Sequence, residues 1–172
     1  LEDSKAKYGL GVVERWHKHG VLGPKSLAIH CIHISEKEMD LLKESDVAVA
    51  HNPESNMGNA VGLSPVLPMM KKGVLVGLGT DGYTADMFES YKVANCLHKH
   101  GAKLPSVAWT EPPTMLFENN KKIMNRQIDG EVGNKKQYDP RAYGRLGEAG
   151  MARRIAQAAE QLGSAGKSVS AK

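Results

Sequence analysis

The sequence predicts an α/β fold in which parallel strands alternate with helices. Three short apolar runs, at residues 26–33, 46–51 and 74–81, are separated by segments whose apolar residues recur at helical spacing. Runs that are apolar on both faces are typical of parallel strands joined by crossover helices. The 172 residues, 41% of them hydrophobic, suit one domain with a small extension and exclude a disordered chain.

Local signals justify the helices in turn. Gly20 and Gly73 are expected to stop the helices that precede them. Ser35 and Glu38 have the spacing of a capping box, in which each side chain bonds the other residue's backbone. Amphipathic helices are therefore expected over four segments: 4–19, 35–44, 63–72 and 84–100.

A polar residue stands near the end of each predicted strand: His30 in the first, His51 in the second and Asp81 in the third. Ligands of parallel α/β sheets bind at the carboxyl ends of the strands. His30 and His33 do not form a metal pair, because residues three apart in a strand point to opposite faces. His30 considered alone is either a satisfied core residue or a ligand.

Asp81 follows seven small or apolar residues, where an unpaired charge would be costly. It needs a cation, a cluster of donors or a metal, or else it caps the helix that begins near Thr84; both interpretations stay open. The segment 51–56 is a turn-forming loop or a binding loop. Residues 77–82 match GxGxxG in letters only, because Asp81 occupies the turn, and a dinucleotide site is excluded.

Three segments resemble the last three strands of the amidohydrolase superfamily: Leu27–His33, Ala50–Asn56 and Gly77–Gly82. Within it they are similar to the chlorohydrolase and aminohydrolase branch, specifically SsnA-like proteins. The resemblance covers residues 1–127 and implies a partial (β/α)₈ TIM barrel, about strands six to eight with their helices. It also implies an enzyme that hydrolyses or deaminates small-molecule rings and amides with a divalent metal, zinc being expected. The two widely spaced cysteines indicate a reduced, cytoplasmic protein.

The resemblance implies roles for individual residues. Asp81 matches the eighth-strand aspartate, which would bind the metal and accept a proton from the attacking water. His30 matches the sixth-strand histidine, which orients water or substrate, or is itself a ligand. Metal binding makes water a nucleophile near neutral pH. The segment after the seventh strand implies substrate-binding residues: His51, Asn52, Ser55 and Asn56.

The three segments that resemble the family contain neither its first-strand HxH nor its fifth-strand histidine. A complete barrel needs roughly 200 to 250 residues, so the chain is expected to hold three of eight strands. Asp81 and His30 cannot fill a four-ligand site. We therefore expect an inactive fragment or chimera that requires a complementing barrel half or an oligomer.

Residues 128–172 resemble the C-terminal tail of class II fructose-bisphosphate aldolases, on segments 128–136, 138–141 and 151–155. This resemblance implies packing at a subunit interface and a phosphate contact for Arg141. The charge changes here too: residues 134–172 carry a net charge of +5, and the rest of the chain −1. Without the family resemblance, the sequence predicts an Ala-rich helix over residues 148–162 that could cover an apolar face.

Two other functions stay open: an aldolase-related chain, or a non-catalytic assembly module whose open sheet edges self-associate. The composition excludes several classes. Cys31 and Cys96 are too few and too far apart for a disulfide scaffold, and no apolar run is long enough to cross a bilayer. Scarce aromatic residues make nucleic-acid binding unexpected.

Overall fold

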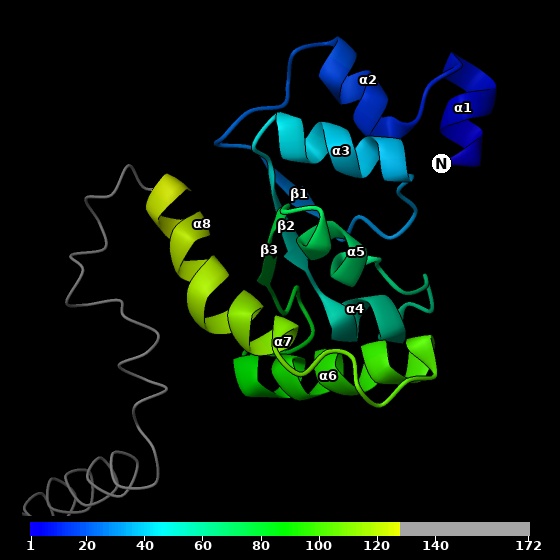
Figure 1. Ribbon diagram of the computed structural model, residues 1–172. Helices are drawn as coiled ribbons and strands as arrows, with labels where there is room; N and C mark the ends of the chain where they lie inside the picture. The colour runs from blue at the N-terminus through cyan, green and yellow to red at the C-terminus, as the bar shows by residue number, and fades with distance from the viewer. Residues whose placement is uncertain (128–172) are drawn as a thin grey trace, which may run out of the picture. The chain divides into compact units, whose positions relative to one another are not determined.

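A computed structural model describes residues 1–127, which belong to the first of the two units into which the chain divides, Leu1–Asn134. Three strands form one sheet with helices packed around it (Figure 1). The helices are α1 (Glu2–Tyr8), α2 (Val12–Lys18), α3 (Glu36–Glu44), α4 (Pro53–Gly58), α5 (Val66–Lys71), α6 (Met87–Ala102), α7 (Glu111–Pro113), the π-helix η1 (Thr114–Asn119) and α8 (Asn120–Gln127).

The sheet is parallel, as the sequence predicts, in the order β1 (Leu27–Ile29), β2 (Ala48–His51) and β3 (Leu75–Leu78). Ala48 of β2 is in register with Leu27 of β1 and with Leu75 of β3. All three strands therefore end at the same edge of the sheet.

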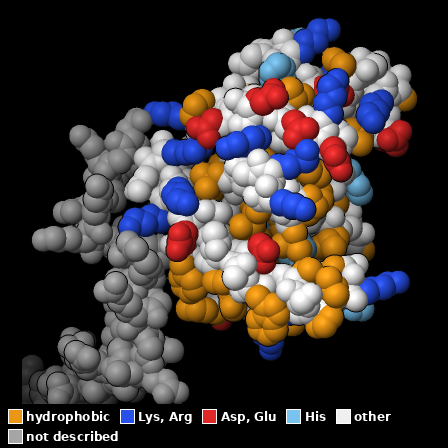
Figure 2. Space-filling model, viewed as in Figure 1, with side chains coloured by type: hydrophobic (Ala, Val, Ile, Leu, Met, Phe, Trp, Pro, Cys, Tyr) orange, Lys and Arg blue, Asp and Glu red, His pale blue; other side chains and the backbone are white. Residues whose placement is uncertain are grey.

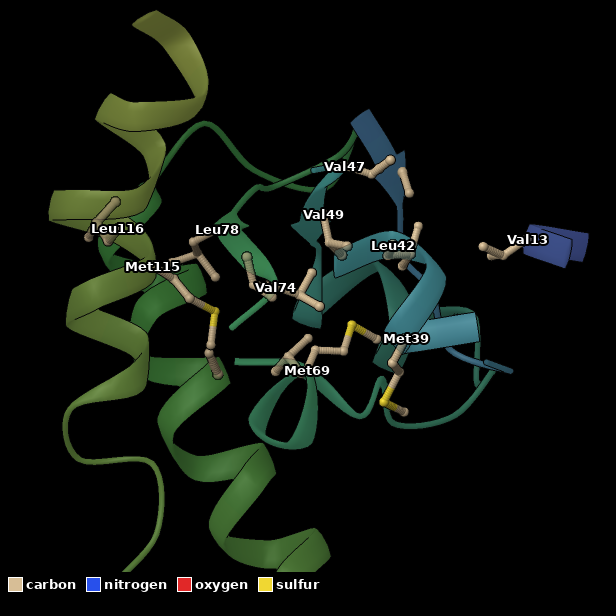
Figure 3. Close-up of a cluster of buried hydrophobic side chains, with 14 residues drawn as sticks. Val13, Met39, Leu42, Val47, Val49, Met69, Val74, Leu78, Met115 and Leu116 are labelled. Atoms are coloured by element: carbon tan, nitrogen blue, oxygen red, sulfur yellow. The ribbon is translucent and has the colours of Figure 1, made fainter. Parts of the chain in front are cut away.

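The core lies between the sheet and the helices on one of its faces. Val49 and Val76 point to this face and are fully buried, together with Leu42 of α3 and Met69 of α5. Figure 3 shows Val49, Leu42 and Met69 within this cluster. Burying a side chain of this size contributes about 1.5–3 kcal/mol to the free energy of unfolding, so this face holds the sheet together.

Helix α8 lies along β3 (Figure 1), an arrangement the sequence does not predict. The Asn120 side chain accepts a hydrogen bond from Leu78 N (2.9 Å) and donates one to Leu78 O (2.8 Å). A Cβ on Gly77 would overlap Asn120 and Ile123, so the helix approaches the strand this closely only because residue 77 is glycine. The edge of β3 away from β2 is therefore covered by asparagine side chains.

The outer edge of β1 differs from that of β3. Among residues 1–127 no strand pairs with it, and Leu27 and Ile29 are 40% and 47% exposed. Other hydrophobic side chains gather over the lower part of the molecule in Figure 2, where α6 and α7 lie. Phe88 at the start of α6 and Trp109 before α7 are 59% and 65% exposed.

The capping box at the start of α3 is confirmed, but the single helix expected over residues 4–19 is wrong. Gly9 takes a left-handed conformation (φ 69°) that ends α1, and α2 starts after Gly11. Glu38, which is 1% exposed, accepts hydrogen bonds from Ser35 N and Val13 N. This carboxylate joins α2 to α3, and its contact with Gly11 leaves no room for a side chain there.

Further boundaries differ from the expected ones: β3 ends at Leu78 instead of residue 81, and α5 begins at Val66 instead of residue 63. The first strand ends at Ile29 instead of residue 33, because His30 and Cys31 have positive φ angles of 65° and 47°. The long helix begins at Met87 and is capped by Asp86, whose side chain accepts from two backbone amides. The turn or loop expected over residues 51–56 is wrong in its second part, because Pro53–Gly58 form helix α4.

Candidate functional site

His30 stands directly after β1, at the carboxyl edge of the sheet. Its backbone N–H donates to Ala50 O (3.0 Å), which continues the pairing with β2 for one residue. The positive φ of His30 and of Cys31 then turns the chain away from the strand direction. The imidazole is 35% exposed, so it is neither a satisfied core histidine nor a free surface side chain.

Asp81 stands three residues after the end of β3, at the same edge. One carboxylate oxygen accepts from Gly82 N (2.8 Å) and the other from the Ser55 hydroxyl (2.7 Å). These two hydrogen bonds, the one from Ser55 first, hold the pKa of the Asp81 carboxyl below its usual range, and His30 adds to the effect. Because Asp86 is the helix cap, the interpretation of Asp81 as a helix cap is wrong.

His30 and Asp81 meet across the middle strand. His30 Nε2 lies 3.6 Å from Asp81 Oδ2, although the two residues follow β1 and β3, which flank β2 and do not pair with each other. The other ring nitrogen, Nδ1, lies 2.8 Å from Asn56 Oδ1. The structure thus brings together the two residues that the sequence singles out for chemistry.

The four residues expected to bind substrate are all buried: His51, Asn52, Ser55 and Asn56 are between 0% and 4% exposed. Ser55 and Asn56 bond Asp81 and His30, as described above. The Asn52 side chain lies against Gly79, where a Cβ would collide with it. All four side chains are shielded from solvent in this structure, and their contact with substrate stays a prediction.

A buried histidine pair lies beside this region, and the sequence does not reveal it. His51 Nε2 is 3.0 Å from His98 Nε2 of α6, and the side chains are 0% and 3% exposed. Burial lowers the pKa of His51 to about 3, with smaller contributions from His98 and His30. Burial likewise lowers the pKa of His98 to about 4, partly opposed by Glu111. Both rings are therefore neutral at physiological pH.

The donors present fit part of a zinc site. Zinc ligands lie about 2.0–2.2 Å from the ion, so two ligands of one tetrahedral ion are roughly 3.3–3.6 Å apart. The separation of His30 Nε2 and Asp81 Oδ2 agrees with this value. Within residues 1–127, no three or more His, Cys, Asp or Glu side chains lie together in a group that could hold a metal. Any further ligands must come from outside the described residues.

Comparison with known proteins decides the family. The sequence profile of the amidohydrolase family matches residues 1–111. The chain belongs to the amidohydrolase family. Over 110 residues this amidohydrolase chain is 44% identical to a 5'-deoxyadenosine deaminase of Methanothermobacter thermautotrophicus. Over 137 residues it is 41% identical to a 5-methylthioadenosine/S-adenosylhomocysteine deaminase of Dictyoglomus thermophilum.

These alignments cover 62% and 77% of the chain but 26% and 32% of the relatives, so the chain spans about a quarter to a third of their length. Among solved structures, a zinc-bound adenosine deaminase from Xanthomonas campestris matches with a TM-score of 0.64 and 27% identity. The match covers 76% of this chain and 30% of that one. A triazine hydrolase variant, 19% identical, shares the fold with a TM-score of 0.63.

The matches support an α/β segment that corresponds to about 30% of an amidohydrolase barrel structure. The assignment to the SsnA-like branch stays a prediction. The aldolase-like tail and the phosphate contact of Arg141 lie outside the described residues and also stay predictions. Within residues 1–127, no helix has both the length and the apolar character that crossing a bilayer requires.

Proposed function

We propose that this chain is the segment of a metal-dependent amidohydrolase that carries Asp81 and His30 of the active site. The observation that carries the proposal is the approach of His30 Nε2 to Asp81 Oδ2 at the carboxyl edge of a parallel sheet. The reaction class is hydrolysis of a C–N bond in a small ring or amide. The substrate class we favour is the adenine nucleosides modified at the 5' position, because deaminases named for such compounds are more than 40% identical to the chain.

The two side chains suit this chemistry. A bound divalent ion, zinc in our proposal, would supply a water molecule acidic enough to ionise near neutral pH. Asp81 is held ionised by Ser55 and Gly82, so its carboxylate can hold a cation and accept a proton. His30 lies within reach of the same position and can orient water or the substrate ring.

Two donors do not complete a zinc site, so the proposal needs further ligands. We propose that they lie on a complementing part of the barrel, whose strand pairs with β1. Within residues 1–127 no strand pairs with the outer edge of β1, and Leu27 and Ile29 are exposed on the face of the sheet opposite the core; both observations support this arrangement. The chain described here would then bind zinc weakly by itself.

A domain exchange tests the proposal. Residues 1–127 would replace the aligned segment of the Dictyoglomus thermophilum deaminase, and the hybrid would be assayed for zinc content and for ammonia release from 5'-methylthioadenosine. We expect stoichiometric zinc and measurable turnover. Asp81→Asn should lower zinc content and reduce kcat/KM by at least about 10²-fold, since a zinc ligand is lost.

Asp40→Asn is the matched control, because Asp40 is an exposed aspartate that pairs with Lys72 on the protein surface. This variant should retain the zinc and the activity of the parent hybrid. A folded hybrid whose Asp81→Asn variant keeps zinc and turnover at the level of Asp40→Asn would contradict the proposal.

A further inference from the structure

Helix α4 connects the two residues of the candidate site. It begins directly after β2, and its consecutive residues Ser55 and Asn56 contact opposite partners. Ser55 Oγ donates to Asp81 Oδ2 at 2.7 Å, and Asn56 Oδ1 lies 2.8 Å from His30 Nδ1. One short helix therefore contacts the residues that follow both flanking strands.

The chemistry of the amide decides where the hydrogen on His30 lies. A carbonyl oxygen can only accept, so His30 Nδ1 must carry the hydrogen and donate it to Asn56 Oδ1. In the neutral ring, Nε2 then has a free lone pair. This lone pair faces Asp81 Oδ2 at 3.6 Å, and two acceptors that face each other need a cation or a hydrogen-bond donor between them.

We propose that Asn56 is a positioning residue that fixes His30 as the Nδ1–H tautomer and keeps Nε2 free to bind what enters the site. Asn56 does not touch substrate in this scheme; it acts through His30. The inference rests on the proposed function for its purpose, but the position of the hydrogen can be measured without any activity.

The burial of Asn56 shields its contact with His30 from solvent. The side chain is 1% exposed, so water does not compete for its oxygen, and Nδ2 has no hydrogen-bond partner among the described residues. An amide turned by 180° would place Nδ2 against His30 Nδ1 and move the ring hydrogen to Nε2. That hydrogen would point at Asp81 and close the gap. The two orientations thus predict opposite tautomers.

Long-range ¹H–¹⁵N correlation spectra of the 172-residue chain distinguish these tautomers, because protonated and unprotonated ring nitrogens have well-separated shifts. The spectra would be recorded at alkaline pH, and the His30 signals would be assigned by their absence from the spectrum of His30→Gln. We expect a protonated Nδ1 and an unprotonated Nε2. In Asn56→Leu the acceptor is gone, and the hydrogen should move to Nε2. In Asn56→Asp an acceptor returns, and the hydrogen should return to Nδ1.

Asn119→Leu is the matched control: Asn119 is 6% exposed and also makes a buried hydrogen bond, to Val76 O, but does not contact His30. Its loss should leave the His30 tautomer unchanged. An Nε2–H tautomer in the wild-type chain overturns the proposal, and this result needs no variant. The proposal is also overturned if the His30 tautomer is unchanged in Asn56→Leu, or if it changes as much in Asn119→Leu as in Asn56→Leu. An inactive hybrid deaminase would contradict the proposed function and leave this measurement intact.

Discussion

The buried pair of His51 and His98 predicts a loss of stability in mild acid. Both rings are neutral in the folded chain, with pKa values lowered to about 3 and about 4 from an ordinary value of 6.5. Below pH 6.5 the unfolded chain binds protons that the folded chain cannot bind. Stability contributed by the pair is therefore complete above pH 6.5 and falls as the pH drops towards the folded pKa values.

The magnitude follows from the size of the two shifts. At about pH 4.5, two units below the unfolded pKa, each neutral buried histidine costs about 2.7 kcal/mol, at 1.36 kcal/mol per unit. His98 recovers a few tenths of this amount, because its folded pKa lies closer to that pH. The pair should together lower the free energy of unfolding by about 5 kcal/mol between about pH 8 and about pH 4.5.

Urea unfolding followed by circular dichroism at these two pH values measures the effect. His98→Gln keeps a hydrogen-bonding partner for His51 but removes one titrating ring. The free energy of unfolding of this variant should therefore fall on acidification by about half as much as that of the wild type. His100→Gln, two residues along α6 at an exposed position, should lose as much as the wild type. Equal pH dependence in wild type and His98→Gln would refute the reasoning, since carboxylates titrate alike in both proteins.

Two further substitutions test the fold, each by its urea midpoint. Ser35→Ala removes the hydroxyl group that caps α3 and bonds Glu38, and should lower the free energy of unfolding by about 1 kcal/mol. Ser45→Ala, at the other end of this helix, should lower it by less. Asn120→Ala removes both hydrogen bonds to Leu78 and leaves the buried backbone N–H and C=O of Leu78 without these partners. The free energy of unfolding should fall by about 1–3 kcal/mol. A wild-type midpoint in Asn120→Ala would show that α8 does not hold the edge of β3.

The sequence predicts the sheet and the proximity of His30 and Asp81 at its carboxyl edge because these signals are local. An apolar run that ends in a polar residue marks the end of a buried strand, and parallel strands bring such ends to one edge. His30 and Asp81 therefore meet as expected. Their separation of 3.6 Å could not be predicted, because it depends on positive φ angles at both residues, which non-glycine residues seldom adopt.

Helix α4 shows why the supporting contacts are harder to predict. Asn52 followed by Pro53 is a common turn signal, but proline is also favoured in the first turn of a helix, and here the helix forms. Likewise, His98 has the sequence context of an ordinary helix residue. Its pairing with His51, 47 residues earlier, comes only from the packing of α6. Polar residues buried by distant partners carry no periodic signal.

The position of α4 also explains how the residues that follow β1 and β3 are held together although β2 lies between these two strands. β1 and β3 do not pair with each other, so nothing in the sheet itself fixes the distance between the residues that follow them. Adjacent helix residues point in directions about 100° apart. Ser55 and Asn56 can therefore contact Asp81 and His30 from one backbone anchored to β2. The geometry of the pair then depends on this helix as much as on the strands, which is why these polar side chains are buried in the protein instead of lining its surface.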